Sequence, residues 1–190
     1  PPFEHPFVDV AKPNALWCMD FKGDFELGDR QRCYPLTVTD AHSRYLLRCH
    51  ALPSTHTRLA KPVLEAAFRE FGLPERIRSD NGSPFASRGL GGLSELSVWL
   101  VKLGVLPERI VPGNPQQNGR HERMHRTLKA ETACPPKADM RMQQRAFGTF
   151  QREYNERRPH EALGQNTPAS HYAASSRPFP TKLEDPHYDG

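Results

Sequence analysis

The sequence is short of the features that mark several common classes of protein. Its four cysteines form no Cys-x-x-Cys pair, and the nearby histidines fit no common zinc-binding spacing. No apolar run approaches the roughly 20 residues that cross a membrane, and no signal peptide is recognisable. These absences argue against a disulfide-stapled secreted module, a zinc finger and an integral membrane protein. We expect reduced, mostly buried thiols in a cytosolic protein.

Two further patterns are missing. The glycine-rich stretch at 86–92 lacks the lysine and following serine or threonine of a phosphate-binding P-loop, so we interpret it as a loop. No internal repeat and no helix-turn-helix pattern appears. With 190 residues, 36% of them hydrophobic, the chain is long enough to bury a real core as one globular domain.

Positive charge is concentrated in one segment. The net charge is +4, but ten lysines and arginines stand against five acids between Gln116 and Arg158. That segment therefore carries +5, and the remainder of the chain is slightly acidic. A basic segment of this kind favours a polyanionic partner.

Hydrophobic periodicity predicts an α/β protein with the order β-β-β-α-β-α-β-α-α. An extended leader at 1–13 precedes a core at 14–158, and a proline-rich tail at 159–190 docks on the core or leaves it. The expected strands are Ala15–Phe21, Arg32–Thr39, Arg44–Leu52, Arg76–Ser79 and Val105–Val111. The expected helices are Thr57–Phe71, Leu93–Leu103, a segment from about Pro115 to Glu131, and Ala138–Arg157.

Each expected helix has one apolar face. These faces consist of Leu59, Val63, Ala66 and Ala67; of Leu96, Trp99, Leu100 and Leu103; of Met124 and Leu128; and of Met140, Phe147, Phe150 and Tyr154. Opposite the last face lie Arg141, Arg145 and Arg152. Those arginines form either a solvated surface or a set of phosphate contacts.

Three acids stand out from the pattern. Asp20 lies in a strand expected to be buried on both faces, where an ionised carboxylate is costly without a cation or strong hydrogen bonds. Asp80 follows the end of another strand, and Glu122 lies on the polar face of a basic helix. Asp40, between two strands, is better explained as a turn-forming residue.

These acids would meet if the first and fourth strands were neighbours and the basic helix crossed their ends. Carboxylate oxygens with open positions suit Mg²⁺ or Mn²⁺ rather than zinc. Two such ions about 4 Å apart support phosphoryl transfer by activating the attacking oxygen and stabilising the leaving one. The sequence therefore predicts a divalent-metal site.

The motifs jointly resemble the integrase catalytic core of DDE transposases, of the bacterial insertion-sequence type related to retroviral integrases. The resemblance runs from about Trp17 to Tyr172. It rests on WCMDF at 17–21, TDAHSR at 39–44, SDNG at 79–82, NPQQNGRHER at 114–123 and YNERRPHEALGQNTP at 154–168.

The resemblance implies a ribonuclease H-like fold with a mixed five-stranded sheet, and a metal-binding catalytic triad of Asp20, Asp80 and Glu122. It implies cleavage at DNA 3′ ends and strand transfer with two Mg²⁺ or Mn²⁺ ions, in a cytoplasmic, DNA-associated bacterial protein that oligomerises on DNA. The DNA contacts expected with it are Asn118, Gly119, Arg126, Lys129, Arg141 and Arg145.

Two alternatives remain open from the sequence. An inactive descendant would use the basic helices for DNA binding or assembly, and a ribonuclease H-type nuclease would cut RNA–DNA hybrids. Three retained carboxylates argue against the first, and the basic helix after Glu122 argues against the second. In the tail, Leu163 and Tyr172 are expected to pack on the core.

Overall fold

A computed structural model describes residues 10–21, 23–79, 94–109 and 119–182, and side chains in the last range from Glu122 onward. The strands are β1 (Trp17–Phe21), β2 (Phe25–Glu26), β3 (Arg32–Asp40), β4 (Leu46–Leu52), β5 (Arg76–Ser79) and β6 (Leu106–Arg109). The helices are α1 (Thr57–Phe71), α2 (Glu95–Lys102), α3 (Gly119–Thr132), α4 (Met140–Glu156), the 3₁₀ turn η3 (Glu161–Leu163) and α5 (Pro168–His171).

The strands form one mixed sheet with β1 at its centre. β1 pairs antiparallel with β3 and parallel with β5, which in turn pairs parallel with β6. β4 pairs antiparallel with β3 and occupies the opposite edge, while β2 adds two residues beside β3. The expected adjacency of the first and fourth predicted strands is therefore confirmed by the β1–β5 pair.

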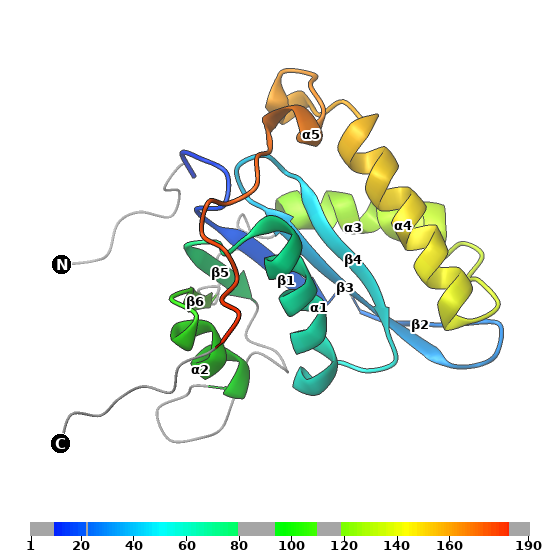
Figure 1. Cartoon of the computed structure of the whole chain (residues 1–190). Helices are drawn as coiled ribbons and strands as arrows, with labels where there is room; N and C mark the ends of the chain where they lie inside the picture. The colour runs from blue at the N-terminus through cyan, green and yellow to red at the C-terminus, as the bar shows by residue number, and fades with distance from the viewer. Residues whose placement is uncertain (1–9, 22, 80–93, 110–118, 183–190) are drawn as a thin grey trace, which may run out of the picture.

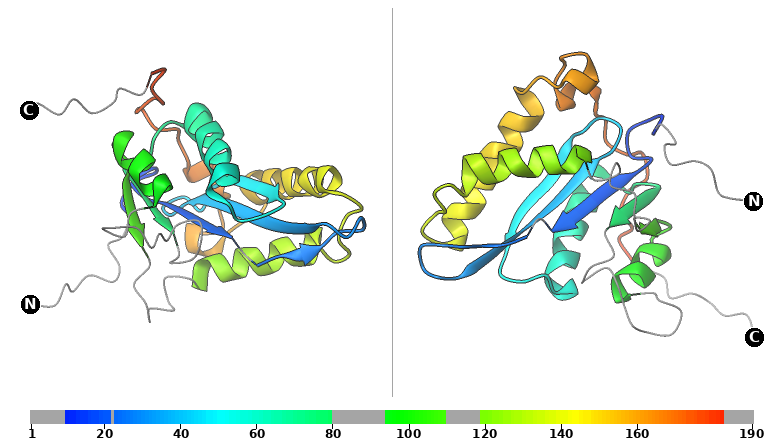
Figure 2. Two further views of the ribbon diagram at one scale, coloured as in Figure 1. Left: turned by 90° about the horizontal axis from the view of Figure 1, so that it is seen from below. Right: turned by 180° about the vertical axis from the view of Figure 1, so that it is seen from behind.

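Helices cover both faces of the sheet (Figures 1 and 2). α1 and α2 pack on one face around Trp17 and Phe68, both fully buried. α3 crosses the other face, and α4 lies beside it along β4, where Leu128 and Phe147 form a second core. No helix in the described ranges is both long and apolar enough to span a membrane.

Side-chain amides of α4 cover the open edge of β4. Asn155 accepts a hydrogen bond from the Leu46 backbone N–H at 2.8 Å and donates one to the Leu46 carbonyl at 2.9 Å. Gln144 does the same for the Ala51 N–H at 2.7 Å and the Cys49 carbonyl at 3.0 Å. An uncovered edge strand presents a template for pairing with another chain, so these amides protect the sheet.

The turn between β3 and β4 is built around Asp40, as the sequence predicts. Asp40 is fully buried and accepts hydrogen bonds from the backbone N–H and hydroxyl of Ser43, at 2.8 and 2.6 Å. It also accepts one from the Asn14 N–H at 2.7 Å. Asp40 is therefore a structural residue rather than a member of the acidic site.

The tail after α4 docks on the core through Tyr172. Its ring stacks on Tyr45 with centroids 4.5 Å apart, and its hydroxyl donates to Asn14 Oδ1 at 2.8 Å. Beyond it, the Arg177 guanidinium donates to the carbonyls of Pro74 and Gly104 at 2.9 and 2.7 Å. The packing role expected for Tyr172 is confirmed.

Several details of the expected architecture need correction. The sheet also contains β2, which is too short to give a periodic signal. The third expected strand is β4, and it begins at Leu46 rather than at Arg44. Ala66 is exposed, because the buried face of α1 runs through Ala60, Val63, Leu64, Ala67 and Phe68 instead. The expected helix starts at Leu93 and Pro115 and the loop at 86–92 lie outside the described residues.

Candidate active site

Asp20 is held in the central strand of the sheet. Trp17 and Met19 point toward the α1 and α2 core, so alternation along β1 turns the Asp20 side chain toward the α3 face. Its backbone is fixed by pairing with Thr37 on β3. The Asp20 side chain is 23% exposed, which leaves the carboxylate partly open to solvent.

β5 brings the chain back beside Asp20. In the parallel β1–β5 ladder, Met19 pairs with Ser79. The next residue in β1 is Asp20, and the next residue in the sequence after Ser79 is Asp80. Asp80 itself lies outside the described residues, as does Asn118.

α3 presents Glu122 on the same side of the sheet. Met124 and Leu128 are 5% and 1% exposed and anchor the helix, as the sequence predicts. Glu122 lies in the first turn and is exposed, as is Arg126. A carboxylate is favoured near a helix N-terminus because the helix dipole is positive there.

His125 connects α3 to Asp20, a role that no pattern in the sequence indicates. Its side chain is 1% exposed, with Nδ1 3.7 Å from Asp20 Oδ2 and Nε2 2.8 Å from Thr37 Oγ1. Because Glu122 precedes His125 by three residues, it lies on the same side of the helix, about 4.5 Å along the axis. The structure therefore brings the Glu122 turn of α3 against Asp20.

Lys129 lies one turn further along α3. A Cβ atom built on Gly23 would lie 3.4 Å from Lys129 Nζ, so the ammonium group sits beside the backbone that follows β1. Gly23 has a φ of +60°, a conformation that suits glycine. Lys129 therefore places positive charge near the end of the strand that carries Asp20.

Arg141 and Arg145 are exposed on α4, away from this turn of α3. Gln143 donates to the Thr132 carbonyl at 3.0 Å, which joins the start of α4 to the end of α3. Thr132 is ten residues from Glu122, or about 15 Å along the helix axis. Among the described acids, the structure does not bring Arg141 and Arg145 together with Asp20 or Glu122.

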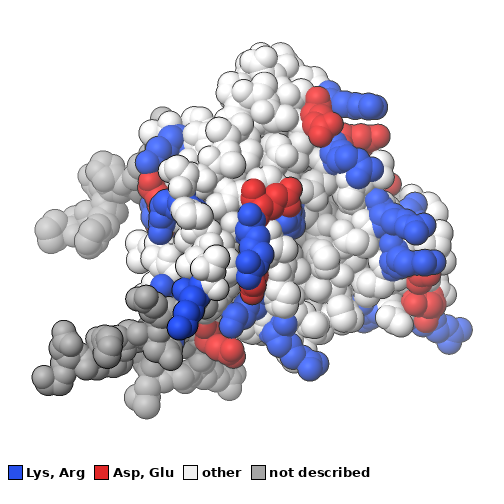
Figure 3. Space-filling model, in the orientation of Figure 1, with Lys and Arg blue, Asp and Glu red and all other residues white. Residues whose placement is uncertain are grey.

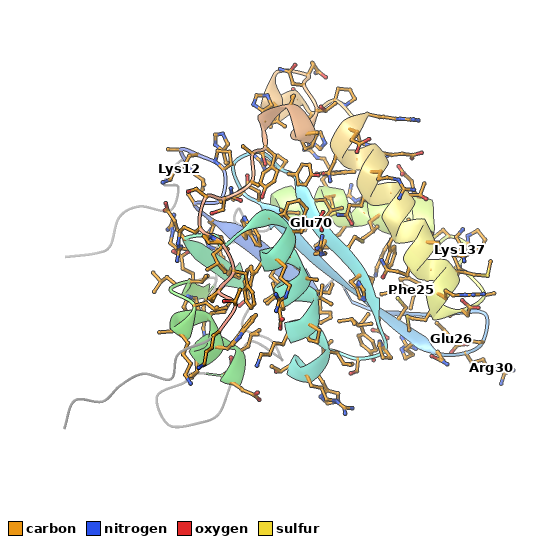
Figure 4. The ribbon with its side chains drawn as sticks, viewed as in Figure 1. Lys12, Phe25, Glu26, Arg30, Glu70 and Lys137 are labelled. Atoms are coloured by element: carbon orange, nitrogen blue, oxygen red, sulfur yellow. The ribbon has the colours of Figure 1, made fainter. Side chains whose placement is uncertain are left out.

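The hairpin of β2 and β3 fixes this distant end of α3. Gly28 and Asp29 donate their backbone N–H groups to the carbonyls of Lys137 and Ala138, at 3.0 and 2.8 Å. Figure 4 labels Phe25 on the hairpin and Lys137 on the connection between α3 and α4, on the same side of the molecule. α3 is thus tied to the sheet near this end and, through His125, at its middle.

Cys18 offers no competing chemistry beside the acids. It precedes Asp20 by two residues and belongs to the same face of β1. Burial raises the pKa of its thiol to about 11, so the sulfur stays protonated near neutral pH. The described residues contain no cluster of three or more His, Cys, Asp or Glu side chains arranged to hold a metal ion.

Family models match most of this structure. An integrase core domain model matches residues 10–115, and a second model with the same description matches residues 103–168. The chain belongs to the integrase core family. It is a catalytic domain of the DDE transposase and integrase type, as the sequence predicts.

Bacterial and viral proteins are similar to this integrase core. An uncharacterised protein of insertion element IS407 from Burkholderia multivorans is 31% identical over 170 residues, covering 87% of this chain and 57% of the relative. One of insertion element IS476 from Xanthomonas euvesicatoria is 30% identical over 168 residues, covering 88% and 46%. The Gag-Pol polyprotein of baboon endogenous virus is 32% identical over 118 residues, covering 62% and 6%. The chain spans about half the length of the two insertion-element proteins.

Solved structures share the fold. The integrase catalytic core of HTLV-2 in complex with magnesium, in its trimeric form, has a TM-score of 0.65 at 16% identity and covers 85% of this chain and 99% of that one. A chain of the simian T-cell lymphotropic virus intasome, in complex with a PP2A regulatory subunit, has a TM-score of 0.69 at 20% identity and covers 94% and 61%. The expected ribonuclease H-like fold is confirmed.

Proposed function

We propose that this integrase core catalyses metal-dependent phosphoryl transfer on DNA, with Asp20, Asp80 and Glu122 as its catalytic carboxylates. The observation that carries the proposal is the contact of α3 with Asp20 through His125, at 3.7 Å. That contact holds the Glu122 turn beside β1, and the β1–β5 pairing sets Ser79, which precedes Asp80 in the sequence, beside Met19, which precedes Asp20.

The donor set fits a hard divalent cation. Asp20 and Glu122 supply carboxylate oxygens that solvent can reach, and Asp80 adds a third carboxylate from the sequence. Oxygen donors with open positions suit Mg²⁺ or Mn²⁺, which retain water and bind substrate phosphates. We propose that these three residues hold two such ions.

The bound ions would activate the attacking oxygen and stabilise the leaving oxygen of an in-line displacement. Asp20, held by the sheet, and Glu122, held by α3, would bind these ions, because a carboxylate repels a phosphodiester unless a cation lies between them. In the first step water attacks a phosphodiester at the transposon end and releases a 3′-hydroxyl. In the second step that hydroxyl attacks a phosphodiester of the target strand and displaces its 3′ oxygen.

We assign the DNA end to the surface of α3 beside the acids. Lys129 and Arg126 would neutralise phosphates there, and Gly119, which opens α3, would let the DNA backbone approach closely. Asn118 is assigned with them from the sequence.

The exposed arginines of α4 serve DNA further from the reacting phosphate, since Arg141 follows the end of α3 that is remote from Glu122. Figure 3 shows basic side chains along the edge of the molecule formed by α4, with acidic ones among them. We propose that Arg141 and Arg145 contact phosphates there. We also propose that several copies of the chain assemble on the DNA.

Substitutions at the carboxylates test the chemistry. We expect Asp20→Asn, Asp80→Asn and Glu122→Gln each to lower the rate by at least about 100-fold, because losing about 3 kcal/mol of transition-state stabilisation has that effect. The assay follows a labelled, branched DNA oligonucleotide that mimics the strand-transfer product, with Mg²⁺ or Mn²⁺, so that no particular transposon end is needed.

Glu131→Gln is the matched control for Glu122→Gln. Glu131 lies on the same helix and accepts a hydrogen bond from Arg158 at 2.6 Å, remote from Asp20. Its replacement should leave the rate unchanged, and circular dichroism checks that all variants fold. Wild-type rates in any one carboxylate variant would remove that residue from the proposal, and cleavage of RNA–DNA hybrids alone would favour a nuclease.

A further inference from the structure

We propose that Thr37 and His125 form a positioning pair that orients the Asp20 carboxylate for metal binding. This inference rests on the proposed role of Asp20 as a metal ligand. It assigns the pair no contact with DNA or metal. The pair acts on Asp20 alone.

The contacts form a short chain across the interface between sheet and helix. Thr37 Oγ1 lies 2.8 Å from His125 Nε2, and His125 Nδ1 lies 3.7 Å from Asp20 Oδ2. Thr37 also pairs with Asp20 across the β1–β3 ladder, so two neighbouring strands hold the residues on either side of His125. Thr37 and His125 are each 1% exposed, which shields these contacts from water.

Hydrogen-bonding geometry favours one arrangement of the protons. Thr37 Oγ1 also lies 3.3 Å from the Asp20 carbonyl oxygen, longer than its 2.8 Å approach to the imidazole. We infer that the hydroxyl donates to His125 Nε2, because an N–H on Nε2 of a neutral imidazole would leave the lone pair of Nδ1 facing the Asp20 carboxylate, which repels it. Nδ1 of a neutral imidazole then carries the proton and faces the Asp20 carboxylate.

An N–H dipole 3.7 Å from a carboxylate oxygen is beyond direct hydrogen-bonding distance, but it still attracts the negative charge. A protein interior strengthens this attraction because its effective dielectric constant is low. The pair would thus hold Oδ2 toward α3 and fix the orientation of the carboxylate plane. Comparable outer contacts to metal ligands change affinity by about 10- to 100-fold.

The packing alone does not call for a histidine. Its neighbours Met124 and Leu128 already anchor α3 with apolar side chains, and a buried imidazole is costly unless its nitrogens find polar neighbours. Thr37 and Asp20 provide those neighbours. A purely structural imidazole would influence the stability of the fold, whereas a positioning residue also influences metal affinity.

Metal affinity, measured without DNA, separates these two roles. Mn²⁺ binding would be followed by electron paramagnetic resonance on the full chain, with Mg²⁺ as the competitor. We expect His125→Leu and Thr37→Val to weaken Mn²⁺ binding about tenfold or more. Thr37→Ser keeps the hydroxyl and should restore wild-type affinity, and His125→Asn, which keeps an N–H donor, should recover part of it.

The Thr37→Val and Thr37→Ser pair decides the question if His125→Leu does not fold. Equal Mn²⁺ affinity in Thr37→Val, Thr37→Ser and the wild type would overturn the inference, as would wild-type affinity in a folded His125→Leu. Asp20→Asn separates this outcome from failure of the proposed function. If the pair variants and Asp20→Asn all bind Mn²⁺ like the wild type, Asp20 is not a metal ligand and the proposed function fails. If the pair variants bind like the wild type but Asp20→Asn loses binding, only the positioning role is wrong.

Discussion

Replacing Asn155 with alanine should destabilise the protein by uncovering the edge of β4. Asn155 is 2% exposed and satisfies both backbone groups of Leu46, at 2.8 and 2.9 Å. In Asn155→Ala the Leu46 carbonyl keeps a second donor, because Gln151 Nε2 lies 3.0 Å away. The Leu46 N–H loses the partner that Asn155 provides.

The expected loss of stability follows from the Leu46 N–H alone, since the Leu46 carbonyl keeps a donor. A buried N–H left without a partner costs about 1–3 kcal/mol, and truncating the packed side chain adds to it. A domain of this size loses about 2–4 °C in Tm per kcal/mol, so a loss of about 2 kcal/mol predicts a fall of about 4–8 °C. Urea unfolding followed by circular dichroism gives the free energy of unfolding directly.

Two control variants test the reasoning. Asn155→Asp keeps an oxygen to accept from the Leu46 N–H but opposes a charged oxygen to the Leu46 carbonyl, so it should also destabilise. Gln151→Ala removes a donor from the carbonyls of Leu46 and Leu47 and leaves the Leu46 N–H bonded, so its cost should be smaller. Surface substitutions usually change the free energy of unfolding by no more than about 0.5 kcal/mol. A value for Asn155→Ala within that range of the wild type would refute the edge-capping role.

Two further outcomes follow from backbone geometry and thiol burial. Gly72→Ala should lower the free energy of unfolding by about 2–4 kcal/mol, because Gly72 has a φ of +78° and an added Cβ would lie 2.7 Å from the Ser175 carbonyl oxygen. The control is Gly148→Ala in α4, where the added Cβ would meet only Arg152 Nη1 at 3.9 Å, so urea unfolding should show little change. Cys134 is exposed and should react with a thiol reagent in the folded protein, whereas Cys33 is buried, which raises the pKa of its thiol to about 12, and should react only on unfolding. Rapid labelling of Cys33 in the native protein, detected by mass spectrometry, would contradict this.

The sequence could predict elements whose signals are local. Helix Thr57–Phe71 matches α1 at both ends, because a periodic apolar face is followed by Gly72 and Pro74. The buried strand with Asp20 is the central strand β1, since consecutive apolar residues point to both faces of a strand and require cover on both. The apolar periodicity misplaces Ala66, because alanine is small enough to lie on either side of a helix.

Other features depend on contacts between distant segments. The amides of Gln144, Gln151 and Asn155 look like ordinary polar helix residues, and no periodicity tells which strand edge they cover. His125 likewise follows Met124 in a basic helix without any local sign of burial. Its neighbours Asp20 and Thr37 lie roughly a hundred residues away in the chain, so only the packing of α3 on the sheet identifies it.

The register of α3 links the fold to the proposed chemistry. Met124 and Leu128 anchor the helix, and this same rotation turns His125 to Asp20 and leaves Glu122 open one turn away. A rotation by one residue would move each side chain by 100° and turn His125 away from Asp20. The apolar anchors therefore do more than stabilise the core: they determine that His125 faces β1. On this account, the distance between the two carboxylates is set by the packing of α3, and the orientation of Asp20 is set by Thr37 and His125.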